Sequence, residues 1–344
     1  MNRFFSDNPL WHEQIGRIYA LLERAKISEE QSKDVLLLRR NNRILSISST
    51  TAIEGNRLTV NQVFDVINNK VVFAPLQDIK EVKNAFSAYE QIPKFNPYLV
   101  DDFLNAHRYI TTDLIQESGQ FRTVGVKVIN NKGETVHLGA DAKQVPSLIS
   151  ELFELAKKSN THDLIKSSIV HFMIERIHPF RDGNGRIGRL WQTLMLSKWN
   201  DLFEWLPVET MIYFSQEKYY EALQKSHNSD NEIDCRPFVN FMLDTIENSV
   251  CQYVDNNEPS DDGVNGGTNG GTNGGTNGGV FSNLPIAQIE ILELIKENAH
   301  IKAFEMAQRL KKPVRTIENN LRQLREKGVI VRIGPNKTGH WKII

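Results

Sequence analysis

Apolar residues recur at intervals of three and four positions along most of the chain, which is the spacing of helices with one buried face. The pattern is clearest from Ile165 to Ile177 and from Ile187 to Met195, on either side of a break at Pro179. Proline lacks the N–H that a helix needs and disfavours helical angles in the residue before it. Further helices are predicted over residues 28–51, 60–73, 78–89, 101–117, 145–158 and 215–223, with one more from Arg236. The predicted fold class is mainly α.

Two short stretches alternate instead with the period of two that is typical of β-strands. Val124 to Ile129 is rich in β-branched residues, and Thr135 to Leu138 resumes the pattern. Between them, Asn130-Asn131-Lys132-Gly133 has the composition of a turn. We predict a β-hairpin, and a surface hairpin without a task is one interpretation of it.

A different organisation begins near residue 255. Asp255 to Gly279 contains three Asn-Gly-Gly-Thr repeats, which have little to bury and predict a flexible tether. From Asn283 onward, three short helical patterns are followed by two β-type runs, Val329–Ile333 and His340–Ile343, around a Gly-Pro turn. This order resembles a small α+β winged helix-turn-helix domain. We expect the domain to have its own core and few contacts across the tether.

Composition narrows the class of protein. A chain of 344 residues with 40% hydrophobic content is long enough for two or three domains with proper cores. No apolar run approaches 18 residues and the start lacks an apolar signal segment, which predicts a cytoplasmic protein without a membrane span. Cys235 and Cys251 form neither a disulfide framework nor a metal motif. The net charge of −1 divides into +6 for residues 283–344 and −7 for the rest.

The break between the two central helices has the composition of an anion-binding turn. Gly183-Asn184-Gly185 can adopt left-handed angles, so that successive N–H groups point into one concavity. The concavity opens a helix, whose first N–H groups lack intrahelical partners and whose dipole is positive. Arg186 and Arg189 lie on one helix face and can clamp phosphate oxygens. Asp182 offers a carboxylate to Mg²⁺, and the His178 imidazole can accept a hydroxyl proton.

The stretch from His178 to Arg189 matches, at every specified position, the His-Pro-Phe-x-(Asp/Glu)-Gly-Asn-Gly-Arg-x-x-Arg signature of Fic proteins. The chain therefore resembles a Fic-domain protein adenylyltransferase, which implies transfer of AMP from ATP to a Ser, Thr or Tyr hydroxyl of a target protein. The resemblance makes His178 the base and Asp182 the Mg²⁺ ligand, with Arg189 on the γ-phosphate. The ATP-binding residues that it implies are Gly183, Asn184, Gly185, Arg186, Ile187, Gly188 and Arg189. Family members that phosphorylate or use other nucleotide-like donors tend to depart from the Gly-Asn-Gly-Arg core, which is intact here.

A second motif lies at the end of the helix predicted over residues 28–51. Thr50 and Glu54-Gly55-Asn56 match the (Ser/Thr)-x-x-x-Glu-(Gly/Asn) inhibitory motif of Fic proteins. Taken alone, Glu54 is an ordinary exposed residue at a helix end, with Gly55 as a C-cap. Within the resemblance, a Glu54 carboxylate paired with Arg189 removes the cation that should hold the γ-phosphate, and so inhibits the protein.

The resemblance also gives the predicted hairpin a role as a flap that docks the target's acceptor segment by strand addition. The flap residues nearest the nucleotide would be Ile129, Asn130, Asn131 and Lys132. Tyr219 is the candidate for a contact with adenine, with help from His227 or Asn228, although a half-buried helix aromatic explains Tyr219 equally well. His107 is interpreted as a packed histidine rather than a ligand.

These motifs divide the chain into four parts: an N-terminal helical region with the inhibitory helix (1–95), a Fic core (96–254), the Asn/Gly/Thr-rich linker (255–282) and the winged helix (283–344). Three functions stay open. The first is AMP transfer, and the second is removal of AMP from a target with Glu54 positioning the attacking water. The third is DNA-binding transcriptional regulation with the Fic core as a nucleotide sensor.

The expected ligands are ATP and Mg²⁺, and the expected macromolecular partner is a target protein with an acceptor hydroxyl, which includes the protein itself. DNA is a further candidate through the third helix of the winged helix, although such domains also dock proteins. A homodimer is compatible with the resemblance. The candidate DNA contacts on that helix are Arg315, Asn319, Arg322 and Arg325.

Overall fold

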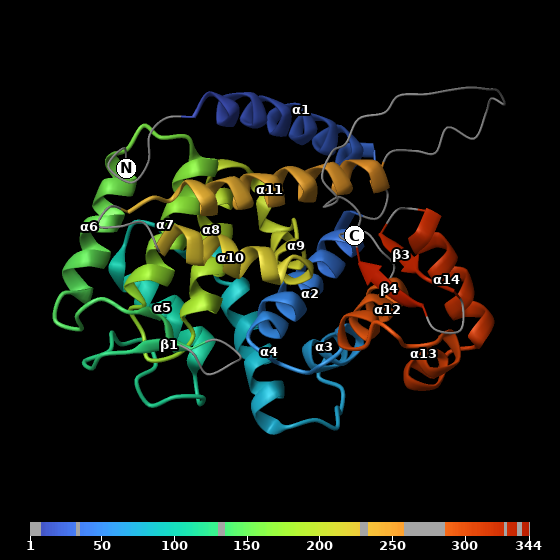
Figure 1. The fold of residues 1–344 in the computed structure, drawn as a ribbon. Coiled ribbons are helices and arrows are strands. Elements are labelled where there is room, and N and C mark those ends of the chain that lie inside the picture. The colour runs from blue at the N-terminus through green and yellow to red at the C-terminus, as the bar shows by residue number, and fades with distance from the viewer. Residues whose placement is uncertain are drawn as a thin grey trace.

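The structure, a computed structural model, describes residues 8–31, 35–129, 135–227, 233–257, 286–326, 329–335 and 339–343. Helices dominate it, which confirms the mainly α class (Figure 1). Two short 3₁₀-helices, η2 (Ile92–Lys94) and η3 (Asp201–Glu204), join longer elements. The α-helices before the linker are α1 (Pro9–Gln31), α2 (Val35–Ile53), α3 (Val60–Ile67), α4 (Leu76–Tyr89), α5 (Val100–Thr111), α6 (Val145–Lys158), α7 (Asp163–Ile177), α8 (Asn184–Trp199), α9 (Val208–Phe214), α10 (Gln216–His227) and α11 (Arg236–Asn257).

Helices α7 and α8 form the centre of the larger body. Both are buried on most of their circumference, and Trp191 of α8 is fully buried. Phe103 of α5 packs edge-on against Trp191, with ring centres 5.0 Å apart, and lies 5.2 Å from the ring of Phe180. Such aromatic contacts add about 0.5–1.5 kcal/mol each beyond the area they bury. The α7–α8 loop is therefore anchored from inside the core.

Helix α1 lies along α11 on the outer side of this body (Figure 1). Its core-facing residues are Trp11, Ile15, Ile18 and Leu22, at helical spacing. The sequence interpretation omitted this helix and expected a single helix over residues 28–51. The structure instead ends α1 at Gln31 and begins α2 at Val35, with α2 continuing to Ile53.

The predicted hairpin is present. Strands β1 (Lys127–Ile129) and β2 (Thr135–Leu138) pair antiparallel, with Lys127 opposite Leu138 and an irregularity between Val128 and Ile129. The proposed flap residues Asn130, Asn131 and Lys132 lie outside the described residues, as does the side chain of Ile129.

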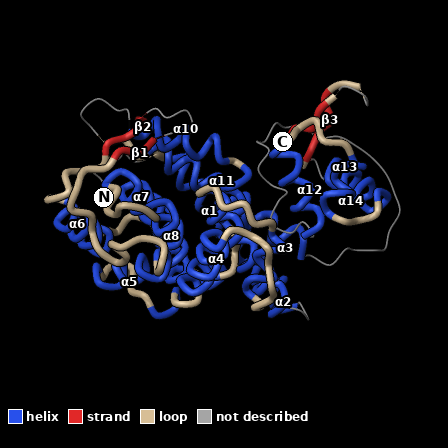
Figure 2. Tube along the Cα trace, turned by 90° about the horizontal axis from the view of Figure 1, so that it is seen from below, coloured by secondary structure: helices blue, strands red, loops and turns tan. Residues whose placement is uncertain are grey.

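The C-terminal elements follow the order predicted for a winged helix. Helices α12, α13 and α14 and strand β3 lie together at one end of the molecule (Figure 2). They are α12 (Ile286–Glu297), α13 (Ala303–Leu310), α14 (Val314–Glu326), β3 (Ile330–Ile333) and β4 (His340–Ile343). The two strands pair antiparallel, with Ile330 opposite Ile343. The predicted linker, residues 255–282, lies almost wholly outside the described residues, so the four-part division stays a prediction.

The packing of this domain differs from the expectation of few contacts. Helix α12 packs against α3, and the apolar residues of the two belong to one buried cluster, to which Val63 and Ile291 contribute. Asn61 of α3 also donates a hydrogen bond to Glu290 of α12. The cluster extends to α2, so the winged helix is joined to the helix that precedes Glu54. No helix among the described stretches is long and apolar enough to cross a membrane.

Candidate active site

The loop between α7 and α8 carries the predicted site residues. Helix α7 ends at His178, whose backbone is left-handed (φ 53°, ψ 62°), and α8 begins after Gly183, which is left-handed at φ 84°. Two such residues turn the chain sharply over a short distance, although the first is not a glycine and is strained. The Asn184 side chain closes the loop with two hydrogen bonds of 2.9 Å to the backbone of Phe180. The loop is thus fixed by its own sequence.

His107 of α5 supports this loop from below. Its ring is fully buried and stacks on Phe180, with centroids 3.6 Å apart. Nδ1 accepts a hydrogen bond from the backbone N–H of Gly119, so the proton is on Nε2, which donates to the carbonyl of Asp182 at 2.9 Å. Burial lowers the pKa of His107 to about 4, which keeps it neutral. The interpretation of His107 as a packed histidine is confirmed.

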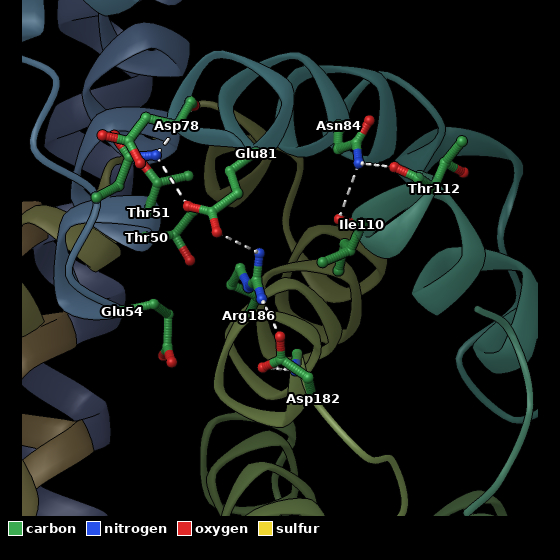
Figure 3. Close-up of polar contacts among 12 residues, drawn as sticks. Thr50, Thr51, Glu54, Asp78, Glu81, Asn84, Ile110, Thr112, Asp182 and Arg186 are labelled. Atoms are coloured by element: carbon green, nitrogen blue, oxygen red, sulfur yellow. Dashed lines mark hydrogen bonds and ion pairs between the residues drawn. The ribbon is translucent and has the colours of Figure 1, made fainter. Parts of the chain in front are cut away.

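Arg186 lies at the first turn of α8 between the carboxylates of Glu81 and Asp182 (Figure 3). Its side chain is 4% exposed, and the nearest approaches are 3.8 Å to Glu81 and 3.4 Å to Asp182. Its Nε and Nη1 atoms are buried and have no hydrogen-bond partner among the described residues. Buried donors without partners cost free energy. The Nη1 atom faces Glu81 beyond hydrogen-bond distance, so the ion pair compensates its charge without a hydrogen bond.

Arg189, one turn further along α8, is paired with the end of α2. Its guanidinium donates to Oγ1 of Thr50 (2.9 Å), to the Thr50 carbonyl (3.0 Å) and to Oε1 of Glu54 (2.7 Å). The Arg189 side chain is 1% exposed and that of Glu54 is 31% exposed. Burial alone would lower the pKa of Arg189, but the Glu54 carboxylate outweighs it and raises the pKa.

The Glu54 carboxylate also lies directly against the backbone of Gly185, where a side chain would collide with it. A carboxylate therefore occupies the space next to the N-terminus of α8. Gly55, at φ 93°, caps α2 in the left-handed conformation that was expected of it. Asn56 then ties this turn to α4 by donating to Glu81 and to the carbonyl of Asp78.

His178 is held with one nitrogen available as a base. Its Nδ1 lies 3.3 Å from the carbonyl oxygen of Glu175, which can only accept, so Nδ1 carries the proton and Nε2 keeps its lone pair. Burial lowers the pKa of His178 to about 4, and His137 and Arg122 act in the same direction. The imidazole is thus neutral at physiological pH.

The sequence and fold of this chain are similar to those of known proteins. A family model described as "Fic/DOC family" matches residues 97–196. A crystal structure of a Fic family protein from Desulfovibrio desulfuricans G20 is 30% identical, covers 99% of this chain and 98% of that chain, and superposes with a TM-score of 0.70. The chain belongs to the Fic family.

Curated relatives of this Fic protein include "Protein adenylyltransferase fic-1" of Caenorhabditis elegans, which is 28% identical over 232 residues. The match covers 64% of this chain and 43% of that protein. "Protein adenylyltransferase Fic" of Nematostella vectensis is 24% identical over 217 residues, covering 60% and 48% respectively. The chain thus spans less than half the length of these curated relatives. A second model, described as "Winged helix-turn-helix DNA-binding", matches residues 285–331.

Two of the predicted nucleotide contacts of this Fic protein, Tyr219 and His227, lie on α10 and not on α8 or the loop before it. Tyr219 is 1% exposed, and its hydroxyl meets Nε2 of His171 at 3.1 Å inside the core. In this arrangement Tyr219 is a core aromatic, while its neighbour Tyr220 is 47% exposed. His227 stacks on His137 of the flap strand β2, with ring centroids 4.0 Å apart. Asn228 lies outside the described residues.

Two functional candidates were not singled out from the sequence. Glu175 lies one turn before His178, and its Oε1 is buried without a hydrogen-bond partner among the described residues. Burial raises the pKa of Glu175 to about 7, with the nearby Glu54 acting in the same direction. Arg122 is 3% exposed and contacts the loop directly. Neither residue belongs to a local motif, so spacing along the chain gave no signal for them.

Proposed function

We propose that this Fic protein is an adenylyltransferase that moves AMP from ATP to a Ser, Thr or Tyr hydroxyl of a target protein. The observation that carries the proposal is the turn between α7 and α8, which joins a neutral His178 at one end to the N-terminus of α8, with Arg186 on its first turn, at the other. The free N–H groups at the start of a helix favour a bound anion, and a neutral imidazole can activate a hydroxyl. The names of the curated relatives support the same activity.

In the proposed reaction, Nε2 of His178 takes the proton of the target hydroxyl. The hydroxyl oxygen then forms a bond to the α-phosphorus of ATP, the bond from that phosphorus to the bridging oxygen breaks, and pyrophosphate leaves. The backbone from Gly183 to Gly188 and the Arg186 guanidinium would hold the phosphates, and Arg189 would hold the γ-phosphate. Catalysis then comes from positioning and from neutralising charge. Tyr220, which is half exposed and close enough to Glu54 to interact electrostatically, is an aromatic candidate for the nucleotide's far end.

Asp182 is the residue that would bind Mg²⁺. A magnesium ion on ATP needs only one or two carboxylates, because phosphates and waters supply its other ligands. Asp182 fits because its carboxylate is 57% exposed at the edge of the nest formed with Arg186. When bound there, the metal supplies charge neutralisation on the phosphates.

Inhibition by Glu54 is the second part of the proposal. The Glu54 carboxylate binds Arg189 and fills the space against Gly185, which is the place of a terminal phosphate in the reaction above. A carboxylate and a phosphate cannot occupy it together. Glu54 would therefore deny ATP its productive position. The removal of AMP, with Glu54 as the group that orients water, stays an alternative, and a cytoplasmic location stays a prediction.

The test uses ATP labelled at either the α- or the γ-phosphate. The full chain with Glu54→Gly should become labelled, or should label its target, from α-labelled ATP alone and only with Mg²⁺. His178→Ala in the same background is the matched control and should stay unlabelled. Label from the γ-phosphate alone would make the protein a kinase-like variant. Release of AMP from a modified target by the wild type, but not by Glu54→Gly, would assign the removal reaction instead.

DNA binding by the winged helix is a second candidate function. Helix α14 exposes all four of its predicted contacts at least in part, and Arg322 and Arg325 line a groove of about 410 Å³ together with Arg332 of β3. Arginines from a helix and from the adjacent wing strand can contact phosphates on both sides of a groove. The full chain should bind mixed DNA duplexes at about 50 mM salt, and the Arg322→Ala and Arg325→Ala variants should bind them more weakly. Absence of binding under those conditions would favour a protein-docking role.

A further inference from the structure

Arg122, in the segment before β1, is spread over four backbone carbonyls. Nε donates to the carbonyl of His178 at 2.6 Å, and Nη1 donates to that of Val124 at 2.8 Å. Nη2 donates to the carbonyls of Ala140 and Ile177, at 2.5 and 3.2 Å. All of these acceptors are neutral, and none is a carboxylate. A buried guanidinium is normally paired with an acid. Asp141 acts on Arg122 electrostatically but accepts none of these hydrogen bonds, so the four carbonyls need another reason.

The four carbonyls belong to three segments that must be fixed relative to one another. Val124 leads into the flap hairpin, Ala140 leads out of it, and Ile177 and His178 end α7. Backbone contacts reinforce the junction: the N–H of Arg122 donates to Pro179 (3.0 Å), and that of Ala140 donates to Ile177 (3.2 Å). The last carbonyls of a helix lack intrahelical partners, so a cation there satisfies two of them at once. His178 has a strained left-handed backbone that only firm neighbours can maintain.

We propose that Arg122 is a positioning residue which locks the flap and the backbone of His178 into one unit. This inference rests on the proposed adenylyl transfer. The flap would bring the acceptor hydroxyl and the helix end would bring the base, so Arg122 sets the distance between the two reacting groups. Displacement of a reacting group by about 1 Å can cost roughly 100-fold in rate. In the proposed function ATP would bind at the N-terminus of α8, which Arg122 does not contact, so its affinity should not depend on Arg122.

Two substitutions separate the geometry of Arg122 from its charge. Arg122→Lys keeps the charge but loses the planar fork, and Arg122→Gln loses both. In the Glu54→Gly background, both should lower kcat about 10- to 100-fold while the Kd for ATP changes less than about threefold. Arg181→Gln is the control, because Arg181 is an exposed arginine of the same loop that lies 3.7 Å from Glu117. It should stay within about twofold of the parent.

An NMR titration of the His178 ring adds a readout that does not depend on transfer. Without the nearby cation, its titration midpoint should rise in Arg122→Gln and stay in place in Arg122→Lys. The proposal is overturned if both variants keep the parent's kcat, or if kcat and ATP affinity fall together. If the parent transfers no AMP, the proposed function fails. The role of Arg122 is then tested by NMR alone, and it is overturned if the His178 resonance and its titration midpoint are unchanged in Arg122→Gln. If Arg122→Gln does not fold, Arg122→Lys still tests the geometry.

A separate observation concerns the winged helix. Lys296 of α12 donates to the carbonyl of Tyr213 at the end of α9 (2.5 Å), and its Nζ lies 3.5 Å from the centre of that ring. The same Nζ lies 3.4 Å from Oε1 of Gln216, the first residue of α10. Gln216 in turn donates from Nε2 to the carbonyl of Ile53 at 3.0 Å. Ile53 is the last residue of α2 and directly precedes Glu54.

From this path we infer that the docked winged helix braces the turn that holds Glu54, and so strengthens inhibition. The inference rests on the proposed inhibition. Gln216 links the two parts. Its side-chain Oε1 is held by Lys296 of the winged helix, and its side-chain Nε2 holds the carbonyl of Ile53 at the end of α2. The apolar cluster that joins α12, α3 and α2 acts in the same direction. A ligand that pulled α12 away would weaken the hold on Glu54.

A double-mutant cycle tests the brace. Lys296→Met and Gln216→Met should each tighten ATP binding about three- to tenfold, and should have no effect once Glu54 is Gly. Lys342→Met, an exposed lysine on β4, is the control and should change nothing. Equal effects with and without Glu54, or none, would refute the brace. If the chain binds no ATP, the proposed function fails. The brace is excluded on its own if amide hydrogen exchange at residues 50–56 is no faster in Lys296→Met than in the parent.

Discussion

Replacing Glu54 by Gly should tighten the binding of ATP about 30-fold. At about 4 Å between charge centres and an effective dielectric of about 20, the attraction between Glu54 and Arg189 is at most about 4 kcal/mol. The Glu54 side chain is 31% exposed, so solvent screens part of this attraction and about 2 kcal/mol remains as a working value. ATP must break the pair to place its γ-phosphate on Arg189. Removing the competitor thus returns about 2 kcal/mol, which corresponds to roughly 30-fold.

The assay compares ATP with AMP by isothermal titration calorimetry in the presence of Mg²⁺. AMP has no γ-phosphate and does not compete for Arg189, so its Kd should stay within about twofold. Glu54→Gln, which removes the charge but keeps an amide that can still bond Arg189, should fall between the wild type and Glu54→Gly. Glu90→Gln is the control, since this half-exposed carboxylate lies 3.8 Å from Arg43, a different arginine.

The outcome with AMP decides the reasoning. If AMP and ATP gain equally, Glu54 blocks the pocket by its volume and not by competing for Arg189. If neither gains, the ion pair has no influence on nucleotide binding and the inhibitory interpretation is wrong.

Three further predictions follow from individual residues. Because the pKa of His178 is about 4, kcat/KM should be flat from about pH 6 to 8, and a midpoint near 6.5 would show a base with an ordinary pKa. Burial raises the pKa of Glu175 to about 7, so its contribution to stability is complete below its unfolded value of about 4.5 and is lost as pH rises through 7. The wild type should therefore lose at most about 3 kcal/mol of unfolding free energy between pH 5 and 8, measured by urea titration, and Glu175→Gln should not show this loss. Parallel plots of unfolding free energy against pH for the two proteins would contradict this. If the winged helix binds DNA through phosphates, Arg325→Ala should lower the slope of log affinity against log salt by about one, and an unchanged slope would exclude that contact.

The sequence was most informative where function is encoded locally. The stretch from His178 to Arg189 is defined by a proline, three glycines and residues at fixed spacing, so it could be picked out as a candidate site without the fold. The hairpin and the winged helix were also predicted, since alternation and turn residues are local signals. Helix α1 shows that a local signal can be present and still be missed, because Trp11, Ile15 and Ile18 have helical spacing.

Other features depend on contacts between distant segments. Arg122 donates to the carbonyl of His178, which lies 56 positions later in the chain, and no periodicity in the sequence relates the two. Tyr219 and Tyr220 are adjacent in an amphipathic helix, and only the position of α10 against the core decides which ring is buried. The docking of α12 against α3 brings together residues 229 positions apart, Asn61 and Glu290. Tertiary packing, rather than local propensity, determines all three.

The spacing of Thr50 and Glu54 explains how one helix end can control the whole site. Residues four apart lie on the same face of a helix, so the Thr50 hydroxyl and the Glu54 carboxylate reach the same guanidinium. Thr50 fixes the orientation of Arg189 with neutral groups, and Glu54 supplies the charge. Because Thr50 does not compete for the phosphate, removal of Glu54 alone should leave Arg189 correctly oriented and free to bind. The proposed inhibition therefore requires no distortion of the catalytic loop, and Asn184 and His107 hold that loop ready in the inhibited arrangement.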